Sequence, residues 1–228
     1  MDDLQRDAAG IGSLADPVRR QLYQFVCAQP TPVSRDQAAR AVGIARHQAK
    51  FHLDRLAAEG LLECEYARLT GRSGPGAGRP AKLYRRARRD IAVSLPQREY
   101  ELAGRLMADA IAESAQTGGP AVEVLYRIAR DYGRSIAEAT DRRPLDAESA
   151  LHLATQVLRQ HGYEPRRADD EFYLANCPFH ALAQNQTELA CGMNHALIAG
   201  VAEALAPYSP HTRLHPRPGQ CCVVLTAG

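Results

Sequence analysis

The sequence has no apolar run that approaches the ~18 residues a helix needs to span a membrane. Its first ten residues, MDDLQRDAAG, are acidic and contain no apolar stretch of the kind found in a secretory signal. We therefore expect a cytoplasmic protein without a membrane partner. Thiols are kept reduced in that compartment, so clustered cysteines there more often bind metal or do redox chemistry than form structural disulfides.

The patterns of common catalytic sites are also missing. There is no Gly-rich phosphate loop and no evident Ser/His/Asp set, and the adjacent pair Cys221–Cys222 lacks the C-x-x-C spacing of thioredoxin-like enzymes. We therefore expect that the protein is not an enzyme. The enzymatic alternative is a thiol oxidoreductase that uses this vicinal pair.

The composition is that of a folded protein with an uneven distribution of charge. Of the 228 residues, 45% are apolar and 24% are charged, which is enough for one large domain or two modest ones. Residues 1–90 carry 16 Lys/Arg against 10 Asp/Glu, whereas residues 91–228 carry 12 against 16. This asymmetry favours a polyanionic partner for the first part of the chain.

The first part contains start and stop signals for three helices. An Asp-Pro step at 16–17 suits an N-cap followed by the first helical residue, and this helix should end before Pro30. A short second helix is expected over 34–41, with Ser34 as its cap, and a third over 45–59. Gly60 is placed to end the third helix.

A β-hairpin is predicted after these helices. Residues 61–69 alternate as a strand would, 71–80 form a Gly-rich tip, and 81–85 can return as a second strand. Three helices followed by such a hairpin are typical of a winged helix-turn-helix, which we assign to residues 1–90.

The third helix and the wing supply the candidate contacts to double-stranded DNA. The first two turns of the helix offer donors suited to base edges and phosphates, and two arginines flank the Gly-rich tip of the wing. The predicted DNA-binding residues are Arg46, His47, Gln48, Lys50, Arg72 and Arg79.

Residues 91–140 are expected to form a helical linker and dimerisation segment. Two amphipathic helices are predicted, one facing inward through Tyr100, Ala103, Met107, Ala110 and Ile111, the other through Val122, Leu125, Ala129, Tyr132 and Ile136. They suit either a dimer interface or packing against the next domain. We favour a homodimer, because helix-turn-helix proteins commonly read paired, inverted half-sites about one DNA turn apart.

The remainder, 141–228, is predicted to be a small α+β sensor domain, which makes the whole chain α+β. The expected elements are a helix over 147–161, strands near 163–167 and 171–176, helical structure over 177–206, and strands near 211–215 and 221–226.

Four of the six cysteines lie in the last 52 residues. They are Cys177, Cys191, Cys221 and Cys222, and the first three are separated by 13 and 29 residues. These intervals exclude a short zinc knuckle, so the fold itself must gather the thiols. Thiolates are soft donors that favour iron–sulfur clusters, zinc or copper(I). Nearby histidines, such as His180 and His195, are further candidate ligands.

Two stretches of the sequence resemble known families. LADPVRRQLYQFV, VGIARHQAKFHLDRLAAEGLL and GAGRPAKLYR, in this order, closely resemble the ArsR-like winged-helix transcriptional regulators. NCPFHALAQNQTELACGMNHALIAGV followed by HPRPGQCCVVL is similar to the C-terminal sensor region of SufR-like repressors, which regulate iron–sulfur assembly genes. Together the similarities run from about Leu14 to Leu225.

The second resemblance implies a homodimeric repressor that carries one iron–sulfur cluster per subunit and binds its operator according to the cluster's presence. A four-iron cluster is expected, with a two-iron cluster as the alternative. Cys177, Cys191 and Cys221 match cysteines of the family pattern. The chain lacks a further cysteine that these repressors often have near Leu205, so the fourth ligand is open between Cys222 and His195.

A second interpretation keeps the DNA-binding regulator but makes the thiol site a structural zinc site, with a different effector. The two differ in colour, because an iron–sulfur protein is brown and a zinc protein is colourless.

Overall fold

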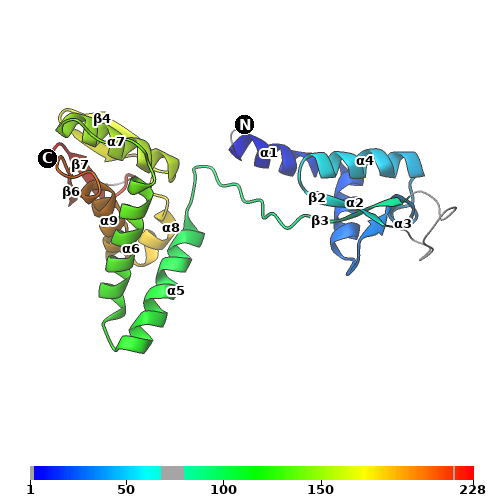
Figure 1. Ribbon diagram of the computed structural model, residues 1–228, viewed down its shortest axis with the longest axis horizontal. Helices are drawn as coiled ribbons and strands as arrows, with labels where there is room; N and C mark the ends of the chain where they lie inside the picture. The colour runs from blue at the N-terminus through cyan, green and yellow to red at the C-terminus, as the bar shows by residue number, and fades with distance from the viewer. Residues whose placement is uncertain (1–2, 68–79, 218) are drawn as a thin grey trace. The chain divides into compact units, whose positions relative to one another are not determined.

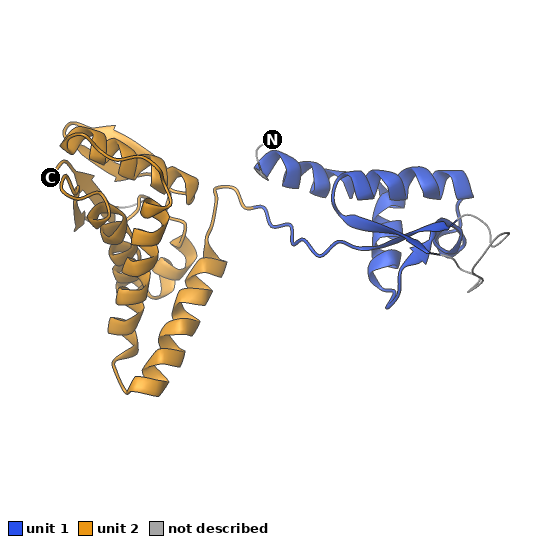
Figure 2. Ribbon diagram, viewed as in Figure 1, with its two compact units in different colours: residues 1–93 blue, residues 94–228 orange. Residues whose placement is uncertain are grey.

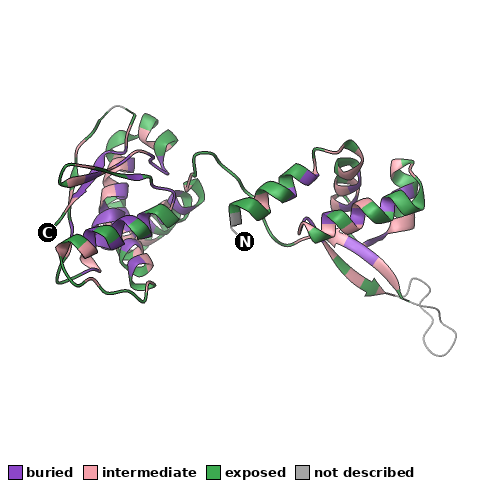
Figure 3. Cartoon of the chain, turned by 90° about the horizontal axis from the view of Figure 1, so that it is seen from above, coloured by how far each residue is buried: buried purple, intermediate pink, exposed green. Residues whose placement is uncertain are grey.

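The computed structural model describes residues 3–67, 80–217 and 219–228. The chain divides into two units, residues 1–93 and 94–228 (Figure 2). Each unit combines helices with a small antiparallel sheet, so the predicted α+β class is confirmed. In both, the buried residues gather on the inward faces of the helices and the exposed residues on the outside (Figure 3). None of the helices in the described part combines the length and the hydropathy needed to cross a bilayer.

The first unit has the helices and the hairpin that the sequence predicts, with two additions (Figure 1). An N-terminal helix precedes the three predicted ones, and a two-residue strand adds to the hairpin, giving a sheet of order β1-β3-β2. Its elements are α1 (Asp3–Ser13), α2 (Pro17–Cys27), β1 (Val33–Ser34), α3 (Arg35–Val42), α4 (Arg46–Ala58), β2 (Leu62–Ala67) and β3 (Ala81–Arg86). The predicted tip, 71–80, lies outside the described residues except for Pro80.

Side-chain caps explain where these helices begin. The Asp16 carboxylate accepts a hydrogen bond from the Arg19 amide at 2.9 Å and so caps α2. At α3 the cap is reciprocal, because Ser34 Oγ accepts from the Gln37 amide while Gln37 Oε1 accepts from the Ser34 amide. Ala45 has no side-chain acceptor to cap α4, but Gln48 Oε1 accepts from its amide at 3.3 Å.

One carboxylate joins α4 to the hairpin. Asp54 accepts hydrogen bonds from Lys82 Nζ at 2.6 Å and from the Tyr84 hydroxyl at 2.8 Å, both on β3. Lys50 Nζ, one turn earlier on α4, donates to it at 2.9 Å. Burial alone would raise the pKa of Asp54, but the three donors hold it at about 2. This one carboxylate therefore joins α4 to β3 and helps to fix the orientation of the helix on the hairpin.

The second unit contains five helices and a four-stranded antiparallel sheet of order β4-β5-β7-β6 in its described residues. The region 177–206, predicted to be helical, contains two helices, and the first of them begins at His180 rather than at Cys177. The elements are α5 (Tyr100–Thr117), α6 (Ala121–Glu138), α7 (Ala147–Gln160), β4 (Pro165–Ala168), β5 (Glu171–Leu174), α8 (His180–Asn185), α9 (Thr187–Glu203), β6 (His211–Leu214) and β7 (Val223–Thr226).

The helices of the expected segment 91–140 share one core with the rest of the second unit. In that core α6 packs against both α5 and α9, so these helices do pack against the following part of the chain, while the favoured dimer interface stays a prediction. Three predicted inward positions, Tyr100, Ile111 and Val122, are exposed instead. Four predicted positions, Ala103, Ala110, Leu125 and Ala129, are buried, so the periodic pattern predicted part of each buried face correctly. Because neighbours lie on two sides of α6 and apolar residues occur around both helices, the observed faces also include Leu102, Leu106, Val124 and Ala137.

The backbones of α6 and α9 meet at glycines. A Cβ atom built on Gly133 would lie 1.9 Å from the Leu197 carbonyl oxygen, and one on Gly200 would lie 2.0 Å from that of Arg130. No side chain fits at such distances. The close approach of the two helices therefore requires glycine at both positions.

We expect Gly200→Ala to lower the free energy of unfolding of the second unit by roughly 1–3 kcal/mol, because overpacking must push α9 away from the Arg130 carbonyl. Native-state hydrogen exchange at the amides of α6 and α9 measures this change. The matched control is Gly104→Ala on α5, where an added Cβ meets nothing within 4 Å. There alanine should stabilise by about 0.5–1 kcal/mol. Equal stabilisation by both substitutions would contradict the contact.

We expect Asp54→Ala to destabilise the first unit by roughly 1–3 kcal/mol, because it leaves the hydroxyl of the buried Tyr84 without its acceptor. Because the pKa of Asp54 is lowered in the folded protein, its carboxylate stabilises the first unit fully above pH 3.8, the ordinary pKa of the group. This stabilisation is lost as the pH falls towards about 2. Hydrogen exchange at β2 and β3 amides, measured against pH, follows it. Asp36→Ala, which removes an exposed pair with Arg46, should change stability by less than ~1 kcal/mol.

Candidate metal centre and nucleic-acid interface

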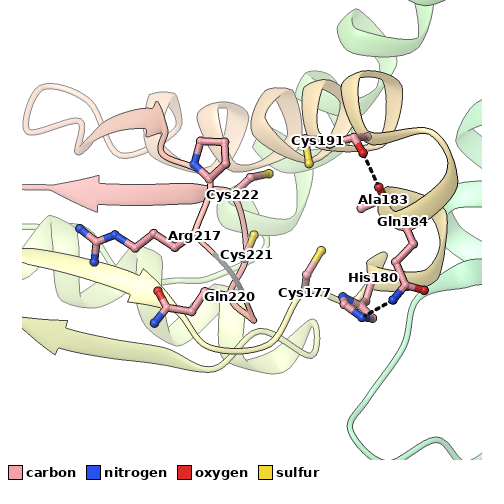
Figure 4. Close-up of a pocket in the computed structure, with 11 residues that line it drawn as sticks. Cys177, His180, Ala183, Gln184, Cys191, Arg217, Gln220, Cys221 and Cys222 are labelled. Atoms are coloured by element: carbon pink, nitrogen blue, oxygen red, sulfur yellow. Dashed lines mark hydrogen bonds between the residues drawn. The ribbon is translucent and has the colours of Figure 1, made fainter.

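Four thiols line one cavity in the second unit. Cys177, Cys191, Cys221 and Cys222 border a space of about 360 Å³. Their sulfurs point towards a common region, whereas the side chains of Arg217 and Gln220 point away from it (Figure 4). All six cysteines of the sequence fall in the described residues and are free thiols. The structure therefore brings together the four cysteines that the sequence singles out.

Three separate segments deliver these thiols. Cys177 lies in the connection between β5 and α8, Cys191 lies in the second turn of α9, and the vicinal pair directly precedes β7. Backbone bonds fix the pair: the Cys221 amide donates to the Leu174 carbonyl at 2.9 Å, and the Cys222 carbonyl accepts from the His215 amide at 2.6 Å. The vicinal pair is thus bound on one side to the end of β5 and on the other to the residue that follows β6.

The segment between β5 and α8 is held through the backbone carbonyl oxygen of Cys177. That oxygen accepts from the His180 amide at 3.1 Å and from Arg98 Nη1 at 2.6 Å. Pro178, which follows, has no amide hydrogen to donate, and its own carbonyl accepts from the Glu99 amide at 3.2 Å. The thiol is therefore presented by a short loop with defined backbone partners.

Hydrogen bonds between the thiols give the four cysteines different pKa values. A hydrogen bond from Cys221 lowers the pKa of Cys177, and the nearby Arg98 guanidinium acts in the same direction. The pKa of Cys222 falls to about 6, first because of Cys221 and then with help from Cys191 and Asn194. Burial raises the pKa of Cys191 to about 12. The thiolate, the form that binds metal, is thus reached at lower pH for Cys177 and Cys222 than for an ordinary cysteine, and at higher pH for Cys191.

A buried amide supports Cys221. Asn194, one turn after Cys191 on α9, is fully buried, and its Nδ2 donates to Cys221 Sγ at 3.0 Å. Its Oδ1 accepts from the hydroxyl of Tyr163, which is also buried. The sequence analysis missed both residues. A polar residue inside the apolar run of α9 was the available signal, because such residues are buried only with hydrogen-bond partners.

The two candidates for the fourth ligand are placed differently. Cys222 lines the cysteine cavity, whereas His195 borders a neighbouring one and shares a hydrogen bond of 3.1 Å with Thr212 Oγ1. His180, by contrast, does line the cysteine cavity, where its ring contacts Gln184 Nε2 at 3.1 Å.

The donor set fits a group with several metal atoms. The thiols surround the cavity from different sides, so each can bind a different atom of one cluster. For a single ion, no three His, Cys, Asp or Glu side chains in the described ranges are grouped to hold it. The remaining cysteines, Cys27 and Cys64, belong to the first unit, where Cys27 is half-buried and Cys64 is exposed.

The predicted DNA contacts on α4 are all exposed, but three have partners within the chain. Arg46 pairs with Asp36 at 2.6 Å, Lys50 pairs with Asp54, and Gln48 caps its own helix. Arg46 and Lys50 remain more than half exposed and can turn towards a phosphate. Arg72 and Arg79 lie outside the described residues.

One exposed apolar residue of α4, which also borders a hollow lined by Ala9, Gly12 and Arg19, was not predicted. Phe51 lies one turn after His47 and is 65% exposed, on the side of α4 opposite the buried Ala49 and Leu53. Its aromatic ring meets the edge of His52. The signal was an apolar residue out of phase with the buried stripe, and such a ring can contact a thymine methyl group.

Comparison with known proteins identifies part of the first unit. Residues 14–65, which run from just before α2 into β2, match a family model described as a helix-turn-helix domain. This match indicates a DNA-binding transcriptional regulator and supports the ArsR-like resemblance of this part of the chain. No curated protein and no solved structure matches the chain.

We expect Asn194→Leu to lower the stability of the second unit by roughly 1–3 kcal/mol, because it leaves the Tyr163 hydroxyl buried without an acceptor. Adding Tyr163→Phe removes that unpaired hydroxyl and should restore a large part of the loss. Hydrogen exchange at α9 amides in the single and double variants measures the difference. If the double variant is as unstable as the sum of the two single variants, the bond contributes nothing.

Proposed function

We propose that the chain is a dimeric DNA-binding regulator, acting as a repressor, whose operator affinity is controlled by an iron–sulfur cluster held in the cysteine cavity. The observation that carries the proposal is the convergence of four thiols from three segments in a protein that also has a helix-turn-helix domain. A thiolate cluster combined with a DNA-reading domain can convert iron or redox status into transcription.

Cys177, Cys191, Cys221 and Cys222 would hold the cluster, one thiolate for each iron of a four-iron form. Neighbouring cysteines seldom bind one iron together, but they can bind different irons of one cluster. When bound, the group supplies reversible one-electron chemistry and sensitivity to oxidants. The buried Asn194 amide supports Cys221, and Cys177, Cys221 and Cys222 are themselves buried against the apolar core, while Cys191 is half-buried.

The DNA-binding surface in this proposal is the exposed face of α4. Arg46, His47 and Lys50 reach phosphates and base edges, with Phe51 beside them. Two copies of the chain would read inverted half-sites. Exposed Ile111 and Val122 near the α5–α6 turn are apolar surface available to the homodimer. A helix-turn-helix regulator of this kind needs no catalytic activity, and the cytosol would keep its thiols reduced.

We expect the chain, purified or reconstituted without oxygen, to be brown and to contain iron and acid-labile sulfide. Cluster-loaded and cluster-free forms should differ in affinity for a DNA duplex that the loaded wild type selects from a random-sequence pool. A ligand can shift DNA binding only by its different affinity for the two conformational states. Equal affinities of both forms would sink the proposed switch.

Cysteine variants test the ligand set. Cys177→Ala, Cys191→Ala and Cys221→Ala should each lose most of the iron and sulfide, and Cys222→Ala should do the same if it is the fourth ligand. The matched controls are Cys27→Ala and Cys64→Ala in the first unit, which should bind iron and sulfide as the wild type does. Stoichiometric zinc with no sulfide would instead support the zinc site.

A further inference from the structure

Residues 97–100, which lead into α5, are tied by hydrogen bonds to the loop that presents Cys177. We call this set of contacts, between residues 97–100 and residues 176–181, the Arg98 latch. Arg98 Nη1 donates both to the Cys177 carbonyl at 2.6 Å and to Asn176 Oδ1 at 3.0 Å. The Glu99 amide donates to the Pro178 carbonyl at 3.2 Å. One guanidinium and one backbone amide thus bind two successive carbonyls of the cysteine loop.

Two further contacts complete the latch. The side-chain amide of the buried Asn176 donates through Nδ2 to the Gln97 carbonyl at 3.1 Å and to the Gly162 carbonyl at 2.6 Å. The Ala181 amide donates to the Tyr100 hydroxyl at 3.3 Å. Asn176 therefore joins the cysteine loop, the segment before α5 and the end of α7. Since the loop uses backbone groups and Asn176 for these bonds, the thiol of Cys177 stays available for another partner.

The other side of this segment leads directly to the DNA-binding unit. Ile91 packs against the core of the first unit, and Arg89 forms an ion pair with Asp7 of α1. Only five residues, 92–96, separate Ile91 from the first residue of the latch. The latch therefore fixes the point at which the chain leaves the second unit. Release of the latch would lengthen the unbound segment between the two units.

We propose that the Arg98 latch transmits the state of the cysteine site to the connection between the two units, with Arg98 as a positioning residue. This inference rests on the proposed function. A cluster bound to Cys177 would hold the loop 176–181 in the arrangement that binds Arg98 and Glu99. Loss of the cluster would free the loop, weaken the latch and lengthen the connection. A longer connection lowers the effective concentration of the second reading helix at a paired half-site.

The test uses the full chain, loaded with cluster or free of it, as wild type, Arg98→Ala, Arg98→Lys and Arg105→Ala. Arg105 is the matched control, an exposed arginine on α5 beyond the latch. Each form is measured by iron and sulfide content, by hydrogen exchange of the amides of residues 97–103, and by affinity for the duplex selected by the loaded wild type.

In the wild type, exchange at 97–103 should speed up when the cluster is removed, and the loaded and free forms should differ in DNA affinity within the ~5–150-fold range usual for allosteric coupling. Arg98→Ala should keep its iron and sulfide but exchange rapidly in both states, and its affinity ratio should fall to about twofold or less on that same coupling scale. Arg98→Lys keeps the charge on a shorter side chain whose single ammonium must reach both acceptors of Nη1, so its ratio should be intermediate. Arg105→Ala should match the wild type.

The outcomes separate the two ideas. A wild type that takes up no cluster overturns the proposed function, and the latch with it. If the wild type shows the expected ratio of DNA affinities between its loaded and free forms, and Arg98→Ala shows the same ratio, only the latch is overturned. Loss of the cluster in a folded Arg98→Ala would make Arg98 a support of the cysteine loop rather than a relay, and so also overturns it. If Arg98→Ala does not fold, the wild type alone tests the latch. Hydrogen exchange at residues 97–103 that is equally fast with and without the cluster would then contradict the latch.

Discussion

The second unit depends on the contact between the backbones of α6 and α9. At Gly133 and Gly200 the two helices approach so closely that a single methyl group would overlap a carbonyl oxygen of the opposite helix. This contact fixes the position of α9 in the core, and α9 carries both Cys191 and the buried Asn194. The position of Cys191 relative to the other thiols is therefore set by helix packing some distance away from them. Burial of apolar side chains stabilises the unit as a whole, but the small residues determine how the helices fit.

Around the cysteine cavity, the buried Asn194 and the backbone carbonyls of the cysteine segments have hydrogen-bond partners, whereas the buried Oε1 of Gln220 has none among the described residues. Asn194 binds the sulfur of Cys221 and the hydroxyl of Tyr163, and the carbonyls of Cys177 and Leu174 are bound by Arg98 and by the Cys221 amide. In a medium of low dielectric constant, each of these bonds would be costly to leave unmade. Except for Cys221, whose sulfur accepts from Asn194, the cysteine segments are held by hydrogen bonds that do not use their sulfurs. The sulfurs therefore stay available to interact with one another or with a metal group.

The two units divide the work that we propose. The first presents an exposed α4 whose place on the wing strand is set by the Asp54 carboxylate, and the second presents the thiols. The connection between them is short, and its second end is bound to the very loop that carries Cys177. A change in the ligation of one cysteine thus has a direct covalent and hydrogen-bonded route to the chain that holds the reading helix.

The sequence by itself determined the local elements and the candidate chemistry. Caps, prolines and glycines placed α2, α3, α4, α7 and the hairpin, because these signals act over a few residues of chain. The thiols that meet in one cavity were also identified, since clustered cysteines are rare and chemically distinctive. The full extent of the inward faces of α5 and α6, the contacts of Asn194 and Arg98, and the different environments of Cys222 and His195 were decided only by the tertiary structure. Each of these depends on which distant segment packs alongside, and helical periodicity carries no information about that.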